Sequence, residues 1–263
     1  MDRLFTHKIF ISTRPEGQSD ELARLFAEAG ARILELPMIK IQPTTLTESE
    51  KNQLKQPGNF DWLTFTSPNG VRYFFENMQN LTGSIRLPEH LRIAVIGKKT
   101  ETTLKDFGYS PSFSNPGKTG EDFADSFTKK IKEENGARPD ILMPLGNLAG
   151  TLLQERLNPV ARCFRINVYE TVMPGSVDEI IFQHIREDRY DMIIFTSPSG
   201  IYNFLKLKGS INDKTLRVAC IGETTFAAAR KKGITPLVVA SKPTARGIFE
   251  SIISYYKHQY IKK

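Results

Sequence analysis

Short apolar runs alternate with longer amphipathic stretches along most of the 263-residue chain. The runs are rich in Ile, Val, Leu and Phe, a composition typical of strands that are buried on both faces of a parallel sheet. The stretches between them place apolar residues three and four positions apart, as in a helix with one buried face. This alternation predicts an α/β fold built from strand–helix–strand units.

Two such units are visible, one near the N-terminus and one in the middle of the chain. Their strands are expected at residues 8–13, 32–36, 140–143 and 162–167, and their helices at residues 18–30 and 148–157. In the first helix, Leu22, Leu25 and Phe26 share one face, as a helix packed on a sheet requires.

A repeat relates two further parts of the chain. Residues 60–74 match residues 190–204 at seven of 15 positions, and both segments contain Phe-Thr-Ser-Pro. Residues 91–119 then match residues 216–244 without a gap. A repeat of this length is too long for a solenoid unit and indicates two similar domains.

Both copies carry the same helix start and stop signals. Ser67-Pro68 and Ser197-Pro198 are predicted to begin helices, with Ser as the N-cap and Pro at the first helical position. Gly108 and Gly233 follow the next amphipathic stretch of each copy and fit as helix C-caps.

The two copies differ at their C-terminal ends. The copy at residues 60–170 ends in its own strand–helix–strand unit, whereas the copy at residues 190–263 has none there. The first 36 residues form a unit of this kind and can supply the missing one. The topology is therefore expected to be discontinuous.

We accordingly expect two similar flavodoxin-like domains with parallel sheets. The first is formed by residues 1–38 and 172–263, and the second, residues 39–171, is inserted into it. The crossings at residues 36–42 and 167–173 are extended in character and predict a two-stranded linker that acts as a hinge. Two self-contained cores favour a monomer.

The formal net charge of +7 and the pI near 9.3 favour an anionic partner, although simple solubility explains the same charge. The two expected domains carry +5 and +2, as two walls of one anion-binding cleft would. Nucleic acid is disfavoured, because the basic runs lie near expected helix ends, where cations complement the helix dipole. These runs are Lys98-Lys99, Lys129-Lys130-x-Lys132 and Arg230-Lys231-Lys232.

Cysteine usage and hydropathy point to a cytoplasmic protein. Cys163 and Cys220 lie 57 residues apart in apolar segments and are expected to be buried reduced thiols rather than a disulfide or a metal site. The N-terminal segment has no apolar stretch of signal-peptide length, and no apolar run approaches the 18 residues that a membrane span needs.

Candidate binding groups lie where the expected strands end. In doubly wound α/β domains, ligands bind beyond the carboxyl ends of the strands, and helix N-termini there bind carboxylates and phosphates. The alternative, favoured for any single residue, is that these hydroxyl groups only cap helices. The segments concerned are Ser12–Arg14, Thr66–Asn69, Gly97–Thr100, Thr196–Ser199 and Gly222–Thr225.

Two other side chains have a functional and a structural interpretation. The Arg14 guanidinium can pair with a substrate carboxylate, or form a surface ion pair with Glu16 or Asp20. The Tyr169 phenol, in the second crossing, can donate a proton at the mouth of the cleft, or pack as an aromatic residue of a β-ladder, which the residues alone favour.

Conventional catalytic sets are missing from the sequence. The four histidines show no metal-ligand spacing, so no metal site is expected. The chain has no Gly-x-Ser-x-Gly elbow, no Walker loop and no Gly-x-Gly-x-x-Gly fingerprint.

The order of the motifs resembles that of the uroporphyrinogen-III synthase family along nearly the whole chain. Each motif is weak alone, but together their order and spacing are fairly specific. The motifs are Thr13-Arg-Pro15 with Gln18-Ser-Asp-Glu-Leu22, Phe65-Thr-Ser-Pro-Asn-Gly70, Val95-Ile-Gly97 with Thr100, Val168-Tyr-Glu-Thr171, Phe195-Thr-Ser-Pro-Ser-Gly200, and Ile221-Gly-Glu-Thr-Thr225. The family has two flavodoxin-like domains joined by a two-stranded linker.

The resemblance implies a reaction. The family takes hydroxymethylbilane, a linear tetrapyrrole with eight carboxylates, expels its terminal hydroxyl as water, closes the ring and inverts ring D to give uroporphyrinogen III. The proposed route passes through an azafulvenium cation and a spiro-pyrrolenine, without cofactor or metal. The resemblance also suggests a transient contact with hydroxymethylbilane synthase, which supplies the substrate.

The resemblance also implies site residues. It gives Tyr169 the role of general acid. Substrate binding is carried over to Thr100, Ser197 and Thr225, with Arg14, Ser67 and Thr224 as weaker additions.

One departure from the family pattern leaves open the alternative that this chain is a member of the family that has lost its activity. Many members have an Arg-Gly-Asn-like turn where this chain has Leu145-Gly146-Asn147. A further rival from another class is a non-catalytic two-domain binding module for a small polyanion. Such a module has no need for a phenol at the hinge, so the presence of Tyr169 favours the enzyme over the binding module.

Overall fold

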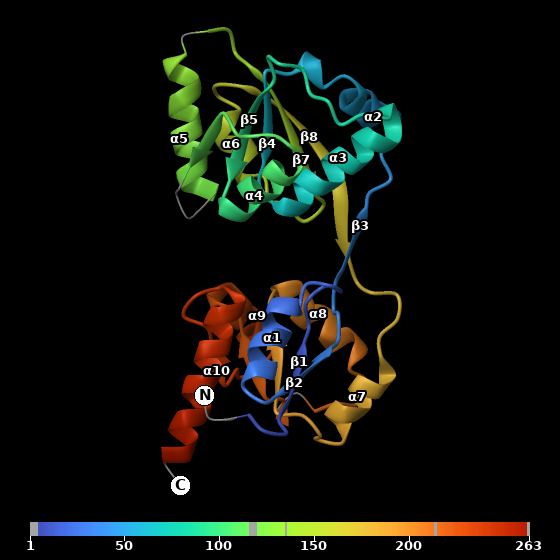
Figure 1. Ribbon diagram of the computed structural model, residues 1–263, viewed down its shortest axis with the longest axis vertical. Helices are drawn as coiled ribbons and strands as arrows, with labels where there is room; N and C mark the ends of the chain where they lie inside the picture. The colour runs from blue at the N-terminus through green and yellow to red at the C-terminus, as the bar shows by residue number, and fades with distance from the viewer. Residues whose placement is uncertain (1–4, 116–119, 135, 213–214, 262–263) are drawn as a thin grey trace. The chain divides into compact units, whose positions relative to one another are not determined.

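The computed structural model describes residues 5–115, 120–134, 136–212 and 215–261. It divides the chain into two compact units (Figure 1). Each unit is an α/β fold with a largely parallel sheet, the fold class that the sequence predicts. Unit 1 comprises Met1–Lys40 and Val172–Lys263, and unit 2 comprises Ile41–Thr171.

Unit 1 is built on a five-stranded sheet. Its elements are β1 (Ile9–Ser12), α1 (Asp20–Glu28), β2 (Arg32–Glu35), α7 (Glu179–Arg186), β9 (Met192–Phe195), α8 (Pro198–Leu207), β10 (Val218–Cys220), α9 (Glu223–Lys231), β11 (Val238–Val239) and α10 (Ala245–Ile261). The strand order is β11-β10-β9-β1-β2, and all neighbours are parallel. Helices α7, α8 and α9 cover one face of the sheet, and α1 and α10 cover the other.

Unit 2 contains the larger sheet, which has six strands. Its elements are β3 (Lys40–Pro43), α2 (Glu48–Lys55), the 3-10 helix η1 (Pro57–Asn59), β4 (Trp62–Phe65), α3 (Pro68–Thr82), β5 (Arg92–Ile96), α4 (Lys98–Asp106), β6 (Phe113–Asn115), α5 (Gly120–Glu133), β7 (Asp140–Gly146), α6 (Leu152–Leu157) and β8 (Arg162–Val172). The strand order is β3-β8-β7-β4-β5-β6. Helices α2, α3 and α4 contribute to the core on one face, and α5 and α6 to the core on the other.

The two sheets correspond strand by strand. The order β11-β10-β9-β1-β2 in unit 1 matches β6-β5-β4-β7-β8 in unit 2. The N-terminal unit β1–α1–β2 therefore occupies the place that β7–α6–β8 occupies in the other sheet. In this way the start of the chain completes a sheet whose other strands come about 180 residues later, as the hydrogen bonds between Thr13 and Ile194, 181 positions apart, illustrate.

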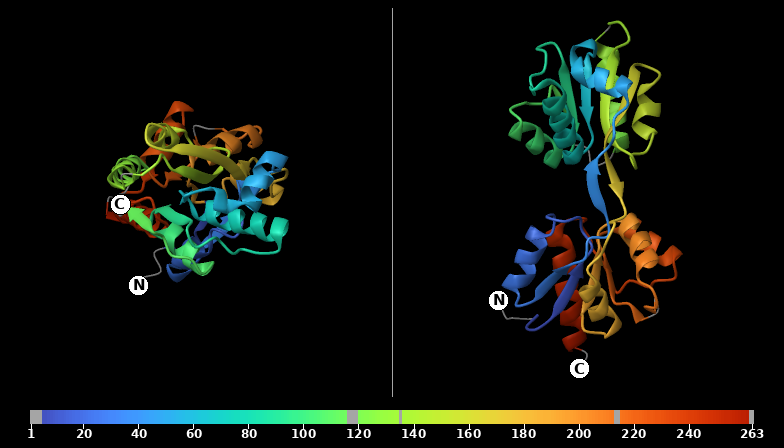
Figure 2. Two further views of the ribbon diagram at one scale, coloured as in Figure 1. Left: turned by 90° about the horizontal axis from the view of Figure 1, so that it is seen from above. Right: turned by 90° about the vertical axis from the view of Figure 1, so that its right-hand side faces the viewer.

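Strand β8 is longer than the sequence indicates. It runs without a break from Arg162 to Val172, so the strand expected at residues 162–167 and the second crossing are one element. Ile166 and Val168 are both fully buried, which continues the inward-facing pattern of the strand into the crossing. Its neighbour at the sheet edge is β3, which lies beside it (Figure 2).

The predicted helix starts and stops are confirmed in both copies. The Ser67 and Ser197 hydroxyls accept the N–H groups of Gly70 and Gly200 at 3.0 and 3.1 Å, with Pro next to each cap. Gly108 and Gly233, with φ angles of 84° and 80°, terminate α4 and α9 in the left-handed conformation that glycine adopts without strain.

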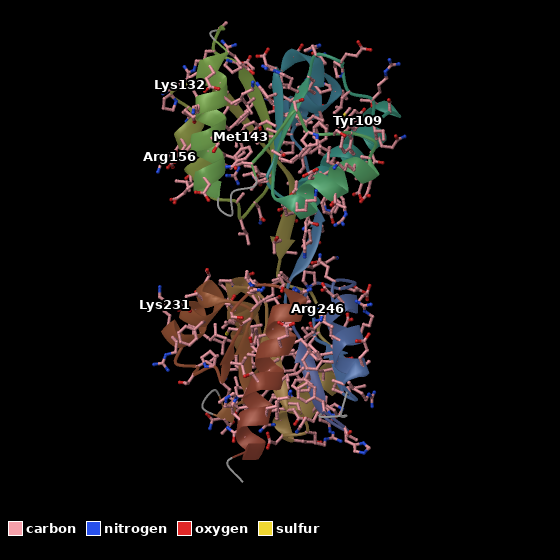
Figure 3. The ribbon with its side chains drawn as sticks, turned by 60° about the vertical axis from the view of Figure 1, so that its left-hand side comes forward. Tyr109, Lys132, Met143, Arg156, Lys231 and Arg246 are labelled. Carbon is pink, nitrogen blue, oxygen red and sulfur yellow. The ribbon has the colours of Figure 1, made fainter. Side chains whose placement is uncertain are left out.

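The explanation of the basic runs by the helix dipole is correct for two runs and wrong for the third. Lys132 and Lys231 lie in the last turns of α5 and α9, where a cation is favourable (Figure 3). Lys98 and Lys99 instead begin α4, at the end where the dipole repels cations. No helix among the described residues is long and apolar enough to cross a membrane.

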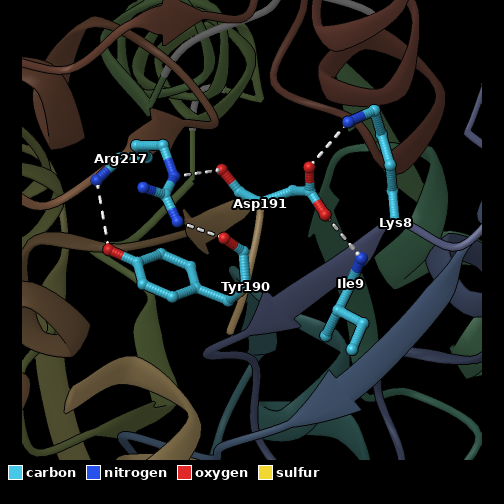
Figure 4. Close-up of polar contacts among 5 residues, drawn as sticks. All are labelled: Lys8, Ile9, Tyr190, Asp191 and Arg217. Atoms are coloured by element: carbon cyan, nitrogen blue, oxygen red, sulfur yellow. Dashed lines mark hydrogen bonds and ion pairs between the residues drawn. The ribbon is translucent and has the colours of Figure 1, made fainter. Parts of the chain in front are cut away.

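Arg217 fixes the amino end of the unit 1 sheet. Its guanidinium lies 4.4 Å from the centroid of the Tyr190 ring, and its Nε donates to the Asp191 carbonyl at 3.0 Å (Figure 4). The Asp191 carboxylate accepts the Lys8 ammonium at 2.7 Å and the Ile9 N–H at 2.8 Å, which ties β9 to β1 (Figure 4). This end of the sheet is therefore occupied by structural contacts.

Both thiols are free, as predicted, although Cys163 is only half-buried whereas Cys220 is fully buried. Burial raises the pKa of Cys163 to about 11 and that of Cys220 to about 12. Because the thiolate is the reactive form, we expect the folded protein to react slowly with an aromatic disulfide reagent at pH 8, and faster as the pH rises. Two thiols should react at once in denaturant, and rapid labelling of one thiol in the folded protein would contradict the burial of these groups.

Candidate active site

The Tyr169 phenol lies at the carboxyl-end edge of the unit 2 sheet, where a helix begins. Its ring stacks on Tyr73 of α3, with centroids 5.7 Å apart and planes 25° apart. Its hydroxyl oxygen is 3.2 Å from the Ser67 hydroxyl, at the N-terminus of α3. The half-buried Tyr169 side chain is thus held by a ring on one side and a hydroxyl at its tip.

A β-bulge aims Tyr169 toward α3. The β7–β8 pairing passes from Leu145–Asn167 to Gly146–Tyr169, so Val168 has no counterpart on β7. In a regular strand, Val168 and Tyr169 would face opposite sides of the sheet. Because of the extra residue, both pack against the core that α3 covers. Bulges commonly re-aim a side chain in this way.

Gly146 provides the surface on which the Tyr169 ring lies. A Cβ placed on Gly146 would come within 2.5 Å of two atoms of the Tyr169 ring and within 2.8 Å of the phenol oxygen. Real Cβ atoms do not approach other atoms so closely, and the backbone of β7 is therefore in direct contact with the ring. Only glycine at this position leaves the ring where it is.

Hydrogen bonds join the turn after β7 to the backbone of β8 at Tyr169 and Thr171. The Asn147 N–H donates to the Tyr169 carbonyl at 3.2 Å. The Asn147 side chain accepts the Thr171 N–H at 2.9 Å and donates to the Thr171 carbonyl at 3.4 Å. Asn147 therefore continues the β7–β8 ladder beyond the end of β7.

The hydroxyl groups of Ser67 and Tyr73, which lie near the Tyr169 side chain, differ in their hydrogen bonds. Ser67 Oγ accepts the Gly70 N–H, which leaves its own hydrogen and a lone pair for Tyr169. Tyr73 donates its hydroxyl hydrogen to the Ile41 carbonyl at 3.2 Å, and burial raises its pKa, so it stays a neutral donor. Of the two tyrosines, Tyr169 alone has its hydroxyl beside a hydroxyl that can exchange a proton with it.

Thr100 and Thr225 occupy equivalent positions in the two copies. Each is the third residue of its helix, α4 or α9, after a glycine N-cap that offers no side-chain bond. Both residues are nearly fully buried, at 2% and 3% exposure, and no described residue hydrogen-bonds either hydroxyl, although neither oxygen is among the fully enclosed unpaired atoms of the described residues. By contrast, the Thr103 hydroxyl bonds back to the Lys99 carbonyl at 3.0 Å.

The N-termini of α4 and α9 are open in a second respect. The N–H groups of their first three residues have no acceptor within the part of the chain that the structure describes, whereas Ser67 and Ser197 cap α3 and α8. Open N-terminal N–H groups attract anions. Thr224 lies at the second position of α9 and is exposed.

In unit 1, the Arg14 and Ser197 side chains already form hydrogen bonds to residues close to them in the sequence. The Arg14 guanidinium donates to the Gln18 carbonyl at 3.0 Å, and burial lowers the pKa of Arg14. Among the described contacts it forms no ion pair with Glu16 or Asp20. The Ser197 hydroxyl, besides capping α8, lies 3.1 Å from the Ser199 hydroxyl.

Parallel strands bring the candidate residues to one edge within each unit. In unit 2, Ser67 follows β4 and Thr100 follows the neighbouring β5, and Ser67 touches Tyr169. In unit 1, Arg14, Ser197 and Thr225 follow the adjacent strands β1, β9 and β10. Among the described residues, no cluster of three His, Cys, Asp or Glu side chains suited to a metal ion is present.

The family model described as Uroporphyrinogen-III synthase HemD matches residues 20–250. The chain belongs to this family. It is 29% identical over 250 residues to the chloroplastic uroporphyrinogen-III synthase of Oryza sativa subsp. japonica, covering 92% of this chain and 79% of the relative. The porphyrin biosynthesis protein HemD of Ruminiclostridium josui is 24% identical over 251 residues, which is 95% of this chain and 49% of that longer protein.

The fold agrees with the family assignment. The crystal structure of uroporphyrinogen-III synthetase from Helicobacter pylori superposes with a TM-score of 0.63 at 17% identity, covering 94% of this chain and 99% of the other. The departure at Leu145 has a local explanation in this member of the family. Its side chain is 4% exposed and belongs to the core cluster that includes Trp62 and Phe127.

The sequence did not reveal Gly146 and Tyr73 as parts of the site. A Gly-Asn pair after a strand indicates a turn, but nothing in the sequence shows that a ring 23 residues later lies on the glycine. Tyr73 follows its helical cap by six residues, and its counterpart in the repeat, Asn203, likewise bonds a backbone carbonyl, that of Met38, at 2.7 Å. The repeat does not mark this position in the sequence, because Tyr73 and Asn203 differ.

Proposed function

We propose that the protein closes hydroxymethylbilane to uroporphyrinogen III, with loss of water and inversion of ring D, and that Tyr169 supplies the proton for the leaving hydroxyl. The assignment of this reaction rests on membership of the uroporphyrinogen-III synthase family. The contact between Tyr169 and Ser67 supports the assignment of the acid. A phenol whose hydroxyl meets a second hydroxyl can hand over its proton and regain one through its neighbour.

The substrate class explains the chemistry of the strand ends. Eight carboxylates call for anion-binding groups rather than for a nucleophile and a base. We assign Thr100 and Thr225 to substrate binding, because each places an unpartnered hydroxyl beside the open N–H groups of a helix start. Arg14, Ser197 and Thr224 add donors in unit 1, and Ser67 adds one in unit 2.

Positioning accounts for most of the catalysis in this proposal. The bilane must be held in one folded conformer so that ring D is inverted before the macrocycle closes, and correct orientation alone contributes roughly 7–11 kcal/mol in well-oriented reactions. The acid needs only to assist departure of water, which contributes roughly 10²–10⁴-fold.

A coupled assay tests the reaction. Hydroxymethylbilane is generated in situ, and the products are separated as porphyrin isomers after oxidation. Predominantly type III product is expected. Type I product alone, from folded protein, would overturn the proposal and leave a polyanion-binding role for the fold.

The two threonines provide a test of substrate binding. We expect Thr225→Val and Thr100→Val to raise KM by roughly 10- to 150-fold each, because a hydrogen bond to a charged group contributes about 1.5–3 kcal/mol. Stability should hardly change, because neither hydroxyl has a partner to lose. Thr103→Val, which removes a bonded hydroxyl on the same helix, is the control and should leave KM unchanged.

Three further expectations stay predictions. They are the monomeric state, the transient contact with hydroxymethylbilane synthase, and the cytoplasmic location.

A further inference from the structure

We propose that Arg165 is a positioning residue, which holds the turn after β7 and, through Gly146, the Tyr169 ring. Arg165 lies on β8 opposite Met143, three residues before the bulge. Neither the sequence motifs nor the assignments above give it a role.

The Arg165 guanidinium bridges three acceptors. Its Nη2 donates to the Gly146 carbonyl at 3.0 Å and its Nη1 to the Ala149 carbonyl at 2.9 Å. Its Nε donates to the Asn167 side-chain oxygen at 3.0 Å. The planar fork of arginine suits several acceptors at fixed angles, which the single ammonium of lysine cannot match. The bonds connect the end of β7, the turn and the bulged strand.

Gly146 lies between the guanidinium and the phenol ring. Its carbonyl accepts Arg165, while its Cα lies against Tyr169, as the 2.5 Å approach of a Cβ there shows. The same carbonyl also accepts the Ala149 N–H at 3.0 Å, which closes the turn. A shift of this turn would therefore move the surface on which the Tyr169 ring rests.

Arg165 acts on Tyr169 from the other face of the sheet. The neighbouring Ile166 and Val168 belong to the core under α3, whereas Cys163 packs with the core under α5 and α6. By strand alternation Arg165 shares the side of Cys163, and the bulge turns Tyr169 toward α3. The guanidinium donates to protein backbone and side chain, which distinguishes positioning from substrate binding.

The proposal rests on the proposed function for its effect on turnover, but its geometric content can be measured separately. The variants are Arg165→Gln and Arg165→Lys, each in the wild-type and the Tyr169→Phe backgrounds. Arg162→Gln is the matched control, because Arg162 lies on the same strand but pairs with Asp140 at its far end. The readouts are kcat and KM in the coupled assay, thermal unfolding, and the NMR signal of ¹³Cζ-labelled tyrosine at position 169, assigned by its loss in Tyr169→Phe.

We expect Arg165→Gln to shift or broaden the Tyr169 signal and to lower kcat on the order of 10- to 100-fold, with KM within about twofold, since small misplacements of a catalytic group have effects of this size. Lysine should restore part of the rate. In the Tyr169→Phe background the substitution should cause little further loss. Arg162→Gln should leave signal and rate unchanged.

Four results would overturn the proposal. They are an unmoved Tyr169 signal, an unchanged kcat, a rise in KM alone, and an equal loss of rate in the Tyr169→Phe background. If Tyr169→Phe itself keeps the wild-type rate, the assignment of the acid fails. The NMR signal then decides the positioning role alone: a moved signal supports it and an unmoved one refutes it.

Discussion

Replacement of Tyr169 by phenylalanine is expected to lower kcat by roughly 10²–10⁴-fold, the range that a single general acid contributes. Phenylalanine keeps the ring on Gly146 and against Tyr73, and removes only the hydroxyl that meets Ser67. The lost hydrogen bond is half-buried, and its loss should lower the free energy of unfolding by about 1 kcal/mol or less. The signature is a large kinetic effect in a protein that remains folded.

Tyr73→Phe is the matched control for this substitution. It removes a phenol hydroxyl from the stacked partner ring, but that hydroxyl donates to the Ile41 carbonyl. We expect a modest loss of stability and a kcat within a few-fold of wild type. The coupled assay and thermal unfolding of both variants make the comparison. Wild-type turnover in Tyr169→Phe would refute the assignment of Tyr169 as the acid.

Gly146→Ala is expected to cause a comparable loss of turnover through geometry alone. The added Cβ would meet the Tyr169 ring at 2.5 Å, so either the ring or the end of β7 must move. Overpacking of this kind lowers the free energy of unfolding by about 1–3 kcal/mol. We expect the phenol to leave Ser67, and kcat to fall toward that of Tyr169→Phe.

Gly150→Ala, in the same turn, controls for a general effect of alanine. A Cβ on Gly150 meets nothing within 4 Å, so both turnover and Tm should stay close to wild type. The double variant Gly146→Ala with Tyr169→Phe should be little slower than Tyr169→Phe alone. If Gly146→Ala keeps full activity, the ring is not held by this contact.

Much of the fold could be predicted because local signals agreed with each other. The Thr-Ser-Pro segments mark the helix starts at Ser67 and Ser197, and the glycines at 108 and 233 mark two helix ends. These signals act over a few residues, so the chain carries them in full. The parallel sheets followed from the length and apolar character of the runs between such signals.

The arrangement around Tyr169 could not be predicted, because it depends on register between distant segments. A motif search finds Tyr169 and Ser67, but not that the chain returns the phenol to the helix cap across a separation of 102 positions. The bulge at Val168 carries no sequence mark, since the strand pattern continues through it. The helix expected from residue 148 begins only at Leu152, because the preceding turn is held by contacts from β8.

The closing of the first sheet by the start of the chain affects the order of events during synthesis. Strand β1 pairs with β2 and β9, and β9 leaves the ribosome only after all of unit 2 has done so. Domains generally fold as units while the chain emerges. Unit 2 can therefore fold before β1 can pair with β9, and arrest of translation at a length at which unit 2 has emerged but β9 has not should give a protease-resistant unit 2 preceded by a digestible N-terminal arm. Strand β1 is therefore made about 180 residues before its partner β9.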